Sequence, residues 1–139
     1  MSEKILLADD HQNMRDVLRS FFEKQPGMEV VAEAENGRTA IKLTRKFRPD
    51  VIIMDIIMPD LNGIDATRWI VEEFPGTKVI ALSMHSDRQF VVGMLKAGAL
   101  GYLLKDCVLE DLVLAIRAVL NHQTYLSSKL ERREVLESG

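Results

Sequence analysis

Five chemically reactive side chains lie at or directly after the ends of short apolar runs of this sequence. Three are acids, one is a hydroxyl and one is an amine, and in chain order they are Asp9, Asp10, Asp55, Ser83 and Lys105. Three carboxylates in one place repel one another unless a cation lies among them, and a cluster of hard oxygens suits Mg²⁺ better than zinc. A lysine and a hydroxyl facing the same point could hold the oxygens of a phosphoryl group. If these side chains meet, the pattern indicates phosphoryl transfer, in which catalysis is mostly positioning and charge stabilisation.

The runs that carry these side chains are predicted to be β-strands. Four to eight apolar residues bounded by turn signals are typical of a strand buried on both faces, as in a parallel sheet. The predicted strands are residues 4–8, 28–34, 51–54, 78–83 and 101–104. In open α/β sheets, ligands bind outside the carboxyl ends of the strands. A packing role therefore explains the position of Asp55 poorly. A catalytic or ligand-binding role explains it better.

The segments between the strands are predicted to be helices. Their apolar residues recur at three- and four-residue spacing, which is typical of a helix face packed on a core. The predicted helices cover 11–24, a segment between Asn36-Gly37 and Pro49, 64–74, 87–97 and 109–120. Asp10 can cap the first of them. Five strands that alternate with five helices predict an α/β fold, with right-handed crossovers that place helices on both faces of a five-stranded parallel sheet.

Length and composition narrow the function classes. A chain of 139 residues is one domain of ordinary size, which is able to bury a core. A formal net charge of −3 argues against nucleic-acid binding by this segment, because phosphate contacts need clustered Lys and Arg. The single cysteine, Cys107, cannot form an internal disulfide, which fits a reducing compartment. Because no apolar run approaches the roughly 20 residues of a membrane helix, we expect a cytoplasmic location and no membrane partner.

Four segments, taken together and in order, resemble the receiver domain of two-component response regulators. They are LLADDH, VIIMDIIMPDLNG, VIALSMH and AGALGYLLKD, and the resemblance covers residues 4 to about 120. It implies a flavodoxin-like, doubly wound (βα)5 fold with strand order 2-1-3-4-5. It also implies that Asp55 accepts a phosphoryl group from a sensor histidine kinase. The chain would then be no enzyme in the usual sense, because it would catalyse only its own phosphorylation and dephosphorylation.

The resemblance also assigns roles around Asp55. Asp10, Asp55 and the backbone carbonyl of Ile57 would bind Mg²⁺, and Asp9 would assist through water. The side chain of Ile57, two residues after Asp55, would tune hydrolysis of the acyl phosphate, as would His85, two residues after Ser83. A bulky apolar Ile57 should hinder an attacking water, so we expect a longer phosphorylated lifetime than in an Ile57→Asn variant.

The remaining roles concern a conformational switch. Lys105 would pair with the phosphoryl oxygens, Ser83 would swing toward them, and Tyr102 would change rotamer when the hydroxyl moves. The face made by the fourth helix, fifth strand and fifth helix would then be the output surface. Taken singly, these residues have simpler interpretations, since Ser83 could be a polar strand end and Tyr102 a buried strand aromatic. Asp106 replaces the proline that often follows the lysine, so the isomer of that peptide bond is left open.

Three short features resemble the LuxR-type, DNA-binding branch of the family. They are the Met-His pair after Ser83, the sequence LLKD, and the run QTYLSSKL. We therefore expect a receiver over 1–120 and a linker or tail over 121–139, without a clear place in the sheet, that leads to a helix-turn-helix domain outside these residues. The output would be transcription, with DNA bound only through that domain. A shortened chain and a stand-alone receiver both remain open, and exposed residues of the first and last helices could form a homodimer face.

Two rival functions and one weaker form of the main hypothesis remain. The first rival is a Mg²⁺-dependent aspartyl phosphohydrolase. One large family of these enzymes needs a second aspartate two residues after the nucleophile, where this sequence has Ile57. A flavin- or nucleotide-binding module on the same fold would cradle phosphate with a Gly-rich loop after the first strand, where this sequence has ADDHQN. A degenerate receiver that acts only through protein contacts is the third alternative.

Overall fold

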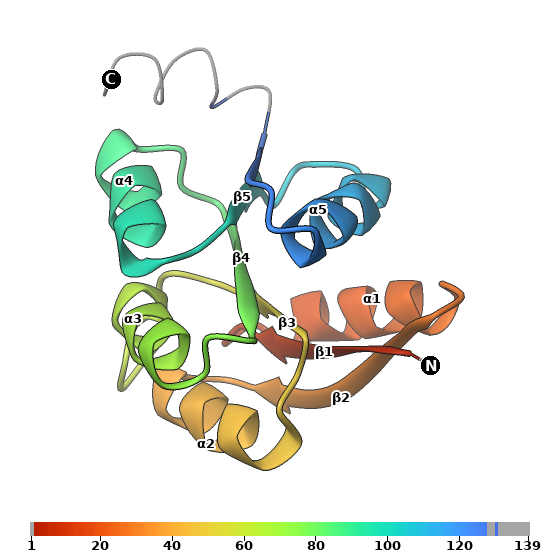
Figure 1. Cartoon of the computed structure of the whole chain (residues 1–139). Coiled ribbons are helices and arrows are strands. Elements are labelled where there is room, and N and C mark those ends of the chain that lie inside the picture. The colour runs from red at the N-terminus through yellow and green to blue at the C-terminus, as the bar shows by residue number, and fades with distance from the viewer. Residues whose placement is uncertain (1, 128–129, 131–139) are drawn as a thin grey trace.

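The computed structural model of the chain describes residues 2–127 and residue 130. Strands and helices alternate along this part of the chain (Figure 1). The strands are β1 (Glu3–Ala8), β2 (Met28–Ala34), β3 (Val51–Met54), β4 (Lys78–Ser83), β5 (Gly101–Leu104) and β6 (Tyr125–Leu126). The helices are α1 (Gln12–Glu23), α2 (Gly37–Phe47), α3 (Gly63–Glu73), α4 (Arg88–Ala97) and α5 (Glu110–Leu120).

The strands form one sheet in the order β2-β1-β3-β4-β5-β6, and every neighbouring pair is parallel. The predicted α/β fold and strand order 2-1-3-4-5 are therefore confirmed. The sixth strand was not predicted, and the expectation that residues 121–139 have no place in the sheet is wrong for Tyr125 and Leu126. The domain boundary near residue 120 stays a prediction.

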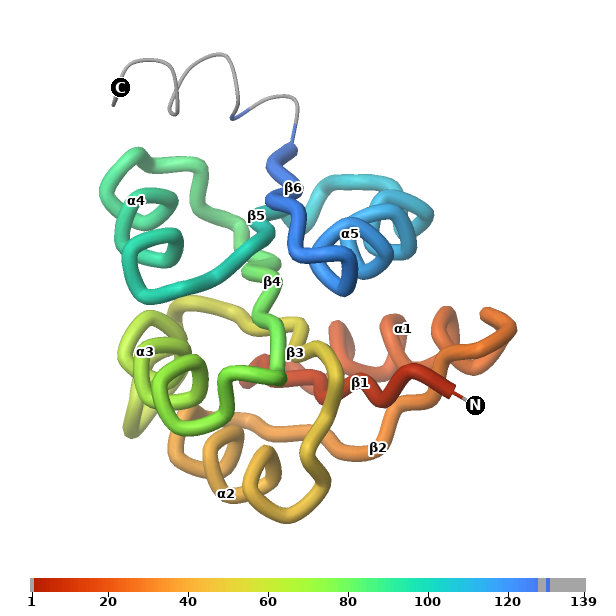
Figure 2. Tube along the Cα trace, in the orientation of Figure 1, coloured from red at the N-terminus to blue at the C-terminus, as the bar shows by residue number. Residues whose placement is uncertain are grey.

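Helices cover both faces of the sheet. Helices α2, α3 and α4 lie on one side, and α1 and α5 lie on the other, as the tube in Figure 2 also shows. Successive strand residues point to opposite faces, so Leu6 and Ile52 pack in the first layer while Leu7 and Ile53 pack in the second. This arrangement explains why the strands read as continuous apolar runs. Within the described part of the chain, no helix has the length and apolar character needed to cross a membrane.

Asparagine side chains cap the N-termini of two helices. The Oδ1 atom of Asn36 accepts a hydrogen bond from the N–H of Thr39, which confirms the predicted strand-to-helix connection at the Asn36-Gly37 pair. Asn62 caps α3 in the same way. The prediction that Asp10 caps the first helix is wrong, because His11 occupies the cap position of α1 and its side chain makes no capping bond.

Two glycines hold the loop between β3 and α3 against its neighbours. The N–H of Gly63 donates a 2.7 Å hydrogen bond to the Ile56 carbonyl, and a Cβ at Gly63 would lie 1.9 Å from the carbonyl oxygen of Asp55. A Cβ at Gly37 would lie 2.2 Å from the carbonyl oxygen of Leu61. Such close approach of two backbones requires residues without side chains. The loop that follows Asp55 is thus pressed onto the end of β3 and onto α2.

Candidate functional site

The carboxyl ends of the central strands bring the predicted reactive side chains onto one rim. Asp9 follows β1, Asp55 follows β3, Ser83 ends β4 and Lys105 follows β5. The sheet ladder continues into the rim, because the N–H of Asp55 donates to the Ala8 carbonyl at 2.8 Å and the N–H of Lys105 donates to the Ser83 carbonyl at 2.9 Å. The positions of these residues therefore follow from strand register.

Lys105 bridges two acids at the centre of the rim. Its Nζ atom lies 2.8 Å from Oδ2 of Asp9 and 3.0 Å from Oδ2 of Asp55. All three side chains are largely buried, with 12% of the lysine side chain exposed. Burial lowers the pKa of Lys105, but the hydrogen bond to Asp9 and the charge of Asp55 outweigh it and leave the pKa raised. The lysine therefore stays charged and partly offsets the repulsion between the two carboxylates.

The carboxylate of Asp55 is buried and oriented. Its Oδ1 accepts a 2.8 Å hydrogen bond from the N–H of Ile56, while its Oδ2 faces Lys105. Burial and the nearby charge of Asp9 raise the pKa of Asp55, and Lys105 opposes that rise. Ionising the Asp55 carboxyl group in this buried position costs free energy, and a cation bound nearby would lower that cost.

Oxygen and nitrogen ligands of four residues converge beside Lys105. One ligand atom each from Asp9, Asp10, His11 and Asp55 can be chosen so that all lie within 4.8 Å of one another. The Nδ1 of His11 lies 3.0 Å from Oδ1 of Asp9 and 3.3 Å from Oδ1 of Asp10. The three carboxylates provide oxygen donors that suit a hard divalent cation such as Mg²⁺, and one lysine offsets only part of their negative charge. His11, whose side chain is 62% exposed, was not singled out from the sequence as a member of this cluster.

Ile57 and His85 line the entrance to the rim. Together with other residues they border a cavity of about 220 Å³, whose lining is Asp10, His11, Asp55, Ile57, Met84, His85 and Lys105. The side chain of Ile57 is half exposed there, and Met84, which was named from the sequence only as part of the Met-His pair after Ser83, is 74% exposed. The assignment of the Ile57 carbonyl as a metal ligand, and of Ile57 and His85 as residues that tune hydrolysis, stays a prediction.

The predicted switch residues, Ser83 and Tyr102, are both buried in the protein interior. Ser83 is fully buried, and its Oγ accepts a 3.0 Å hydrogen bond from the N–H of His85. Tyr102 is also fully buried, and burial raises its pKa to about 12. The peptide bond between Lys105 and Asp106 is trans, as are the other peptide bonds of the described residues. The switching roles of Ser83 and Tyr102 stay predictions.

Comparison with known proteins places this geometry in a family. Residues 5–117 match the family model of the response regulator receiver domain. The chain is 40% identical over 134 residues to the transcriptional regulatory protein DegU of Brevibacillus brevis, an alignment that covers 96% of this chain and 57% of DegU. The chain thus spans between half and two thirds of the length of the first curated relatives that it matches.

Two solved structures are similar over nearly the whole chain. One is the crystal structure of a LuxR-family two-component response regulator from Aurantimonas sp. SI85-9A1, with 34% identity and a TM-score of 0.92 over 99% of this chain and 98% of that one. The other is the isolated REC domain of RcsB from Salmonella enterica serovar Typhimurium in the presence of phosphomimetic BeF3−. It has 25% identity and a TM-score of 0.86 over 95% of this chain and 98% of that one.

Proposed function

The chain belongs to the response regulator receiver domain family, and from this membership we propose that Asp55 accepts a phosphoryl group from a sensor histidine kinase in a Mg²⁺-assisted reaction. The observation that carries the proposal is that Lys105 bridges Asp55 and Asp9, so that the Asp55 carboxylate lies beside both the ammonium and the acids that follow β1. A buried carboxylate oriented by one N–H and one ammonium is suited to nucleophilic attack. The phosphomimetic in the similar RcsB structure supports the same chemistry.

The carboxylates of Asp9, Asp10 and Asp55 form an oxygen-rich donor set that fits a magnesium ion. Asp10, Asp55 and the backbone carbonyl of Ile57 would hold the ion, and Asp9 would assist through water. When bound, the ion supplies positive charge that offsets the charge on the transferred phosphoryl oxygens. The chain contributes position, because Asp9 and Asp55 are already fixed by Lys105 and by the backbone N–H groups of His11 and Ile56.

The transfer step needs little covalent chemistry from the protein. An oxygen of the Asp55 carboxylate attacks the phosphorus atom of the phosphohistidine. The phosphorus–nitrogen bond breaks, and its electron pair stays with the imidazole, which takes up a proton. The product is an acyl phosphate on Asp55, whose oxygens Lys105 can bind with the ammonium that now faces Asp55 at 3.0 Å. Catalysis therefore depends on orientation and charge.

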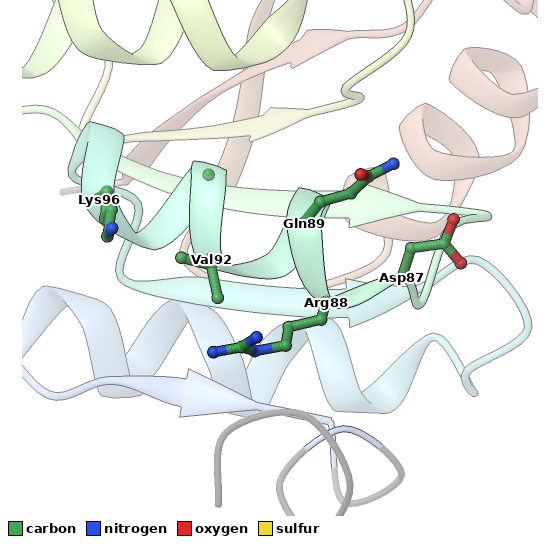
Figure 3. Close-up of a pocket in the computed structure, with 6 residues that line it drawn as sticks. Asp87, Arg88, Gln89, Val92 and Lys96 are labelled. Carbon is green, nitrogen blue, oxygen red and sulfur yellow. The ribbon is translucent and has the colours of Figure 1, made fainter. Parts of the chain in front are cut away.

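The acyl phosphate then changes the local charge and acceptor set. Phosphorylation adds about −1.5 to −2 charges and strong acceptor oxygens beside Lys105 and Ser83. The Ser83 hydroxyl turns toward these oxygens, the loop that starts at Met84 follows it, and Tyr102 adopts another rotamer. The change reaches the face of α4, β5 and α5, which we take as the output surface. An open groove of about 770 Å³ lies along α4, lined by Asp87, Arg88, Gln89, Val92, Gly93 and Lys96 (Figure 3).

The output is transcriptional in this proposal. DegU is named as a transcriptional regulatory protein, and the chain spans 57% of its length. DNA would be bound through a helix-turn-helix domain outside the 139 residues, and access to DNA places the protein in the cytoplasm. Val17 on α1 and Leu114 on α5 are half exposed and mark a face through which two copies could associate.

Chemical trapping tests the acceptor assignment. Acyl phosphates are reduced by borohydride, so treating the phosphorylated protein should convert Asp55 to homoserine. Peptide mass mapping should find this conversion at residue 55. Conversion at another aspartate would contradict the assignment, and steady release of phosphate from many turnovers of an outside substrate would favour the phosphohydrolase instead.

A further inference from the structure

Arg15 links three elements directly behind the acidic rim. From α1, its Nε donates a 3.0 Å hydrogen bond to Oε1 of Glu33, which lies on β2. Its Nη1 donates a 2.5 Å hydrogen bond to the backbone carbonyl of Asp9, which follows β1. Only 11% of the arginine side chain is exposed. The two arms of one buried guanidinium thus tie α1, β1 and β2 together beside a candidate metal ligand.

The bond to Asp9 completes the anchoring of that residue. The N–H of Asp9 donates to the Ala34 carbonyl at 3.0 Å, so Arg15 holds the carbonyl while β2 holds the amide. From this fixed backbone, the Asp9 carboxylate accepts the N–H of His11 at 2.9 Å through Oδ1 and faces Lys105 through Oδ2. The following turn, which carries Asp10, starts from the same anchored backbone.

Arg19 provides an internal comparison one turn further along α1. It also pairs with Glu33, through Oε2, and its second arm binds Oδ1 of Asp16 at 2.9 Å. Both arginines therefore fasten α1 to β2 through Glu33. Of the two, Arg15 is the one that reaches the rim. If the only task were to attach the helix to the sheet, the contact between Arg15 and the Asp9 carbonyl would add little.

We propose that Arg15 is a positioning residue that sets the affinity of the rim for a divalent cation. It holds the turn after β1 so that the carboxylates of Asp9 and Asp10 face Asp55 before the cation arrives. The inference rests on the proposed function of the same site. Outer-shell partners that orient metal ligands typically contribute about 10- to 100-fold in metal affinity. Lysine replaces the guanidinium only in part, because a single ammonium lacks the rigid fork that reaches two acceptors at once.

Metal binding measured without any phosphoryl donor tests this role. The free and bound populations of Mn²⁺ can be followed by electron paramagnetic resonance, and Mg²⁺ affinity obtained by competition. The set is the wild-type chain, Arg15→Met, Arg15→Lys and the matched control Arg19→Met. We expect Arg15→Met to weaken Mg²⁺ binding by about 10-fold or more, Arg15→Lys to weaken it less, and Arg19→Met to leave it within about two-fold.

A second measurement separates positioning from a general structural role. With acetyl phosphate as donor, the Mg²⁺ concentration for half-maximal acyl phosphate formation should rise in Arg15→Met by the same factor as the affinity falls. The rate at saturating Mg²⁺ should stay within about three-fold of wild type, because the missing order is restored when the cation binds.

Several outcomes would overturn the inference. Unchanged Mg²⁺ affinity in a folded Arg15→Met protein would make Arg15 a purely structural residue, and equal losses in Arg15→Met and Arg19→Met would assign the effect to Glu33. If Arg15→Met does not fold, Arg15→Lys decides, and wild-type affinity there would contradict the proposal. A wild-type chain that binds Mn²⁺ but forms no acyl phosphate would reject the proposed function alone, whereas a wild-type chain that binds no Mn²⁺ would reject both.

Discussion

The hydroxyl of Tyr102 donates a 2.6 Å hydrogen bond to the backbone carbonyl of His85. This bond joins β5 to the loop between β4 and α4, two residues beyond the buried Ser83. On its other side, Tyr102 pairs with Leu126 of β6, and its carbonyl accepts the N–H of Ser127 at 2.9 Å. A rotamer change that moves the Tyr102 hydroxyl must therefore break the bond to His85, whereas the backbone pairing with β6 does not depend on the rotamer.

The bond between Tyr102 and His85 should stabilise the folded state. Tyr102→Phe removes the hydroxyl and leaves the His85 carbonyl without that donor, which we expect to lower the free energy of unfolding by about 1–3 kcal/mol. Urea denaturation measures this quantity. Tyr125→Phe is the control, because Tyr125 is partly exposed on the outer strand and its change should stay within about 0.5 kcal/mol. Equal stability of Tyr102→Phe and wild type would contradict the account.

The ionised carboxylate of Asp55 should lower the stability of the folded protein at neutral pH. Burial and the charge of Asp9 raise the pKa of Asp55 above its unfolded value of 3.8. Between these two pKa values the folded state binds more protons than the unfolded state, so stability falls as pH rises through that window. Asp55→Asn, which keeps an acceptor for the Ile56 N–H, should therefore be more stable than wild type at pH 7.

This gain should disappear on acidification. Below the unfolded pKa, Asp55 is protonated in both states and contributes no penalty. Urea denaturation of both proteins at pH 7 and near pH 3.5 measures the difference. Two outcomes would show that Lys105 holds the pKa of Asp55 down instead. Asp55→Asn could be less stable than wild type at pH 7, or its stability relative to wild type could increase in acid.

Lys105 should matter both for stability and for phosphorylation. Lys105→Met leaves Asp9 and Asp55 as two buried carboxylates without their shared cation, and we expect it to lower the free energy of unfolding at pH 7 by about 3 kcal/mol. It should also slow acyl phosphate formation by about 100-fold, because an oriented positive charge is lost from the reacting oxygens. Lys96→Met, at an exposed position of α4, is the control. Wild-type rates in Lys105→Met would exclude the assigned role.

Ile57 should slow hydrolysis of the acyl phosphate. Its half-exposed side chain borders the cavity that an attacking water must enter. In Ile57→Asn a hydrogen bond to that water, worth about 1 kcal/mol, would shorten the phosphorylated lifetime about five-fold. The loss of the mass adduct over time measures the lifetime, with Val108→Asn as an exposed apolar control outside this cavity. A lifetime in Ile57→Asn equal to or longer than that of wild type would refute the prediction.

The rim could be predicted from the sequence because its geometry follows from strand register. Once five apolar runs form a parallel sheet, Asp9, Asp55, Ser83 and Lys105 must lie at the same edge. The pairing of Lys105 with Asp9 could not be predicted, because it depends on where a long flexible side chain points. The place of His11 in the cluster was missed for a similar reason, since one exposed histidine at a helix start carries no sequence signal of its own.

Two other features had weak sequence signals. The strand β6 is only two residues long, and Tyr125-Leu126 shows no alternating pattern long enough to read. Arg15 was not singled out from the sequence, because a charged residue on an amphipathic helix is ordinarily solvated. Its position four residues after His11 places it on the same side of α1 as the rim, and this spacing is the signal that could have revealed it.

Intact mass spectrometry with acetyl phosphate tests the central claim, that Asp55 is a Mg²⁺-dependent phosphoacceptor, most directly. Wild type and Asp55→Asn are each incubated with the donor, with and without Mg²⁺, and circular dichroism confirms that the variant is folded. The account predicts one added phosphoryl group in wild type with Mg²⁺, little or none without it, and none in Asp55→Asn. An adduct that persists in folded Asp55→Asn, or wild-type protein that gains none with Mg²⁺ present, would contradict it.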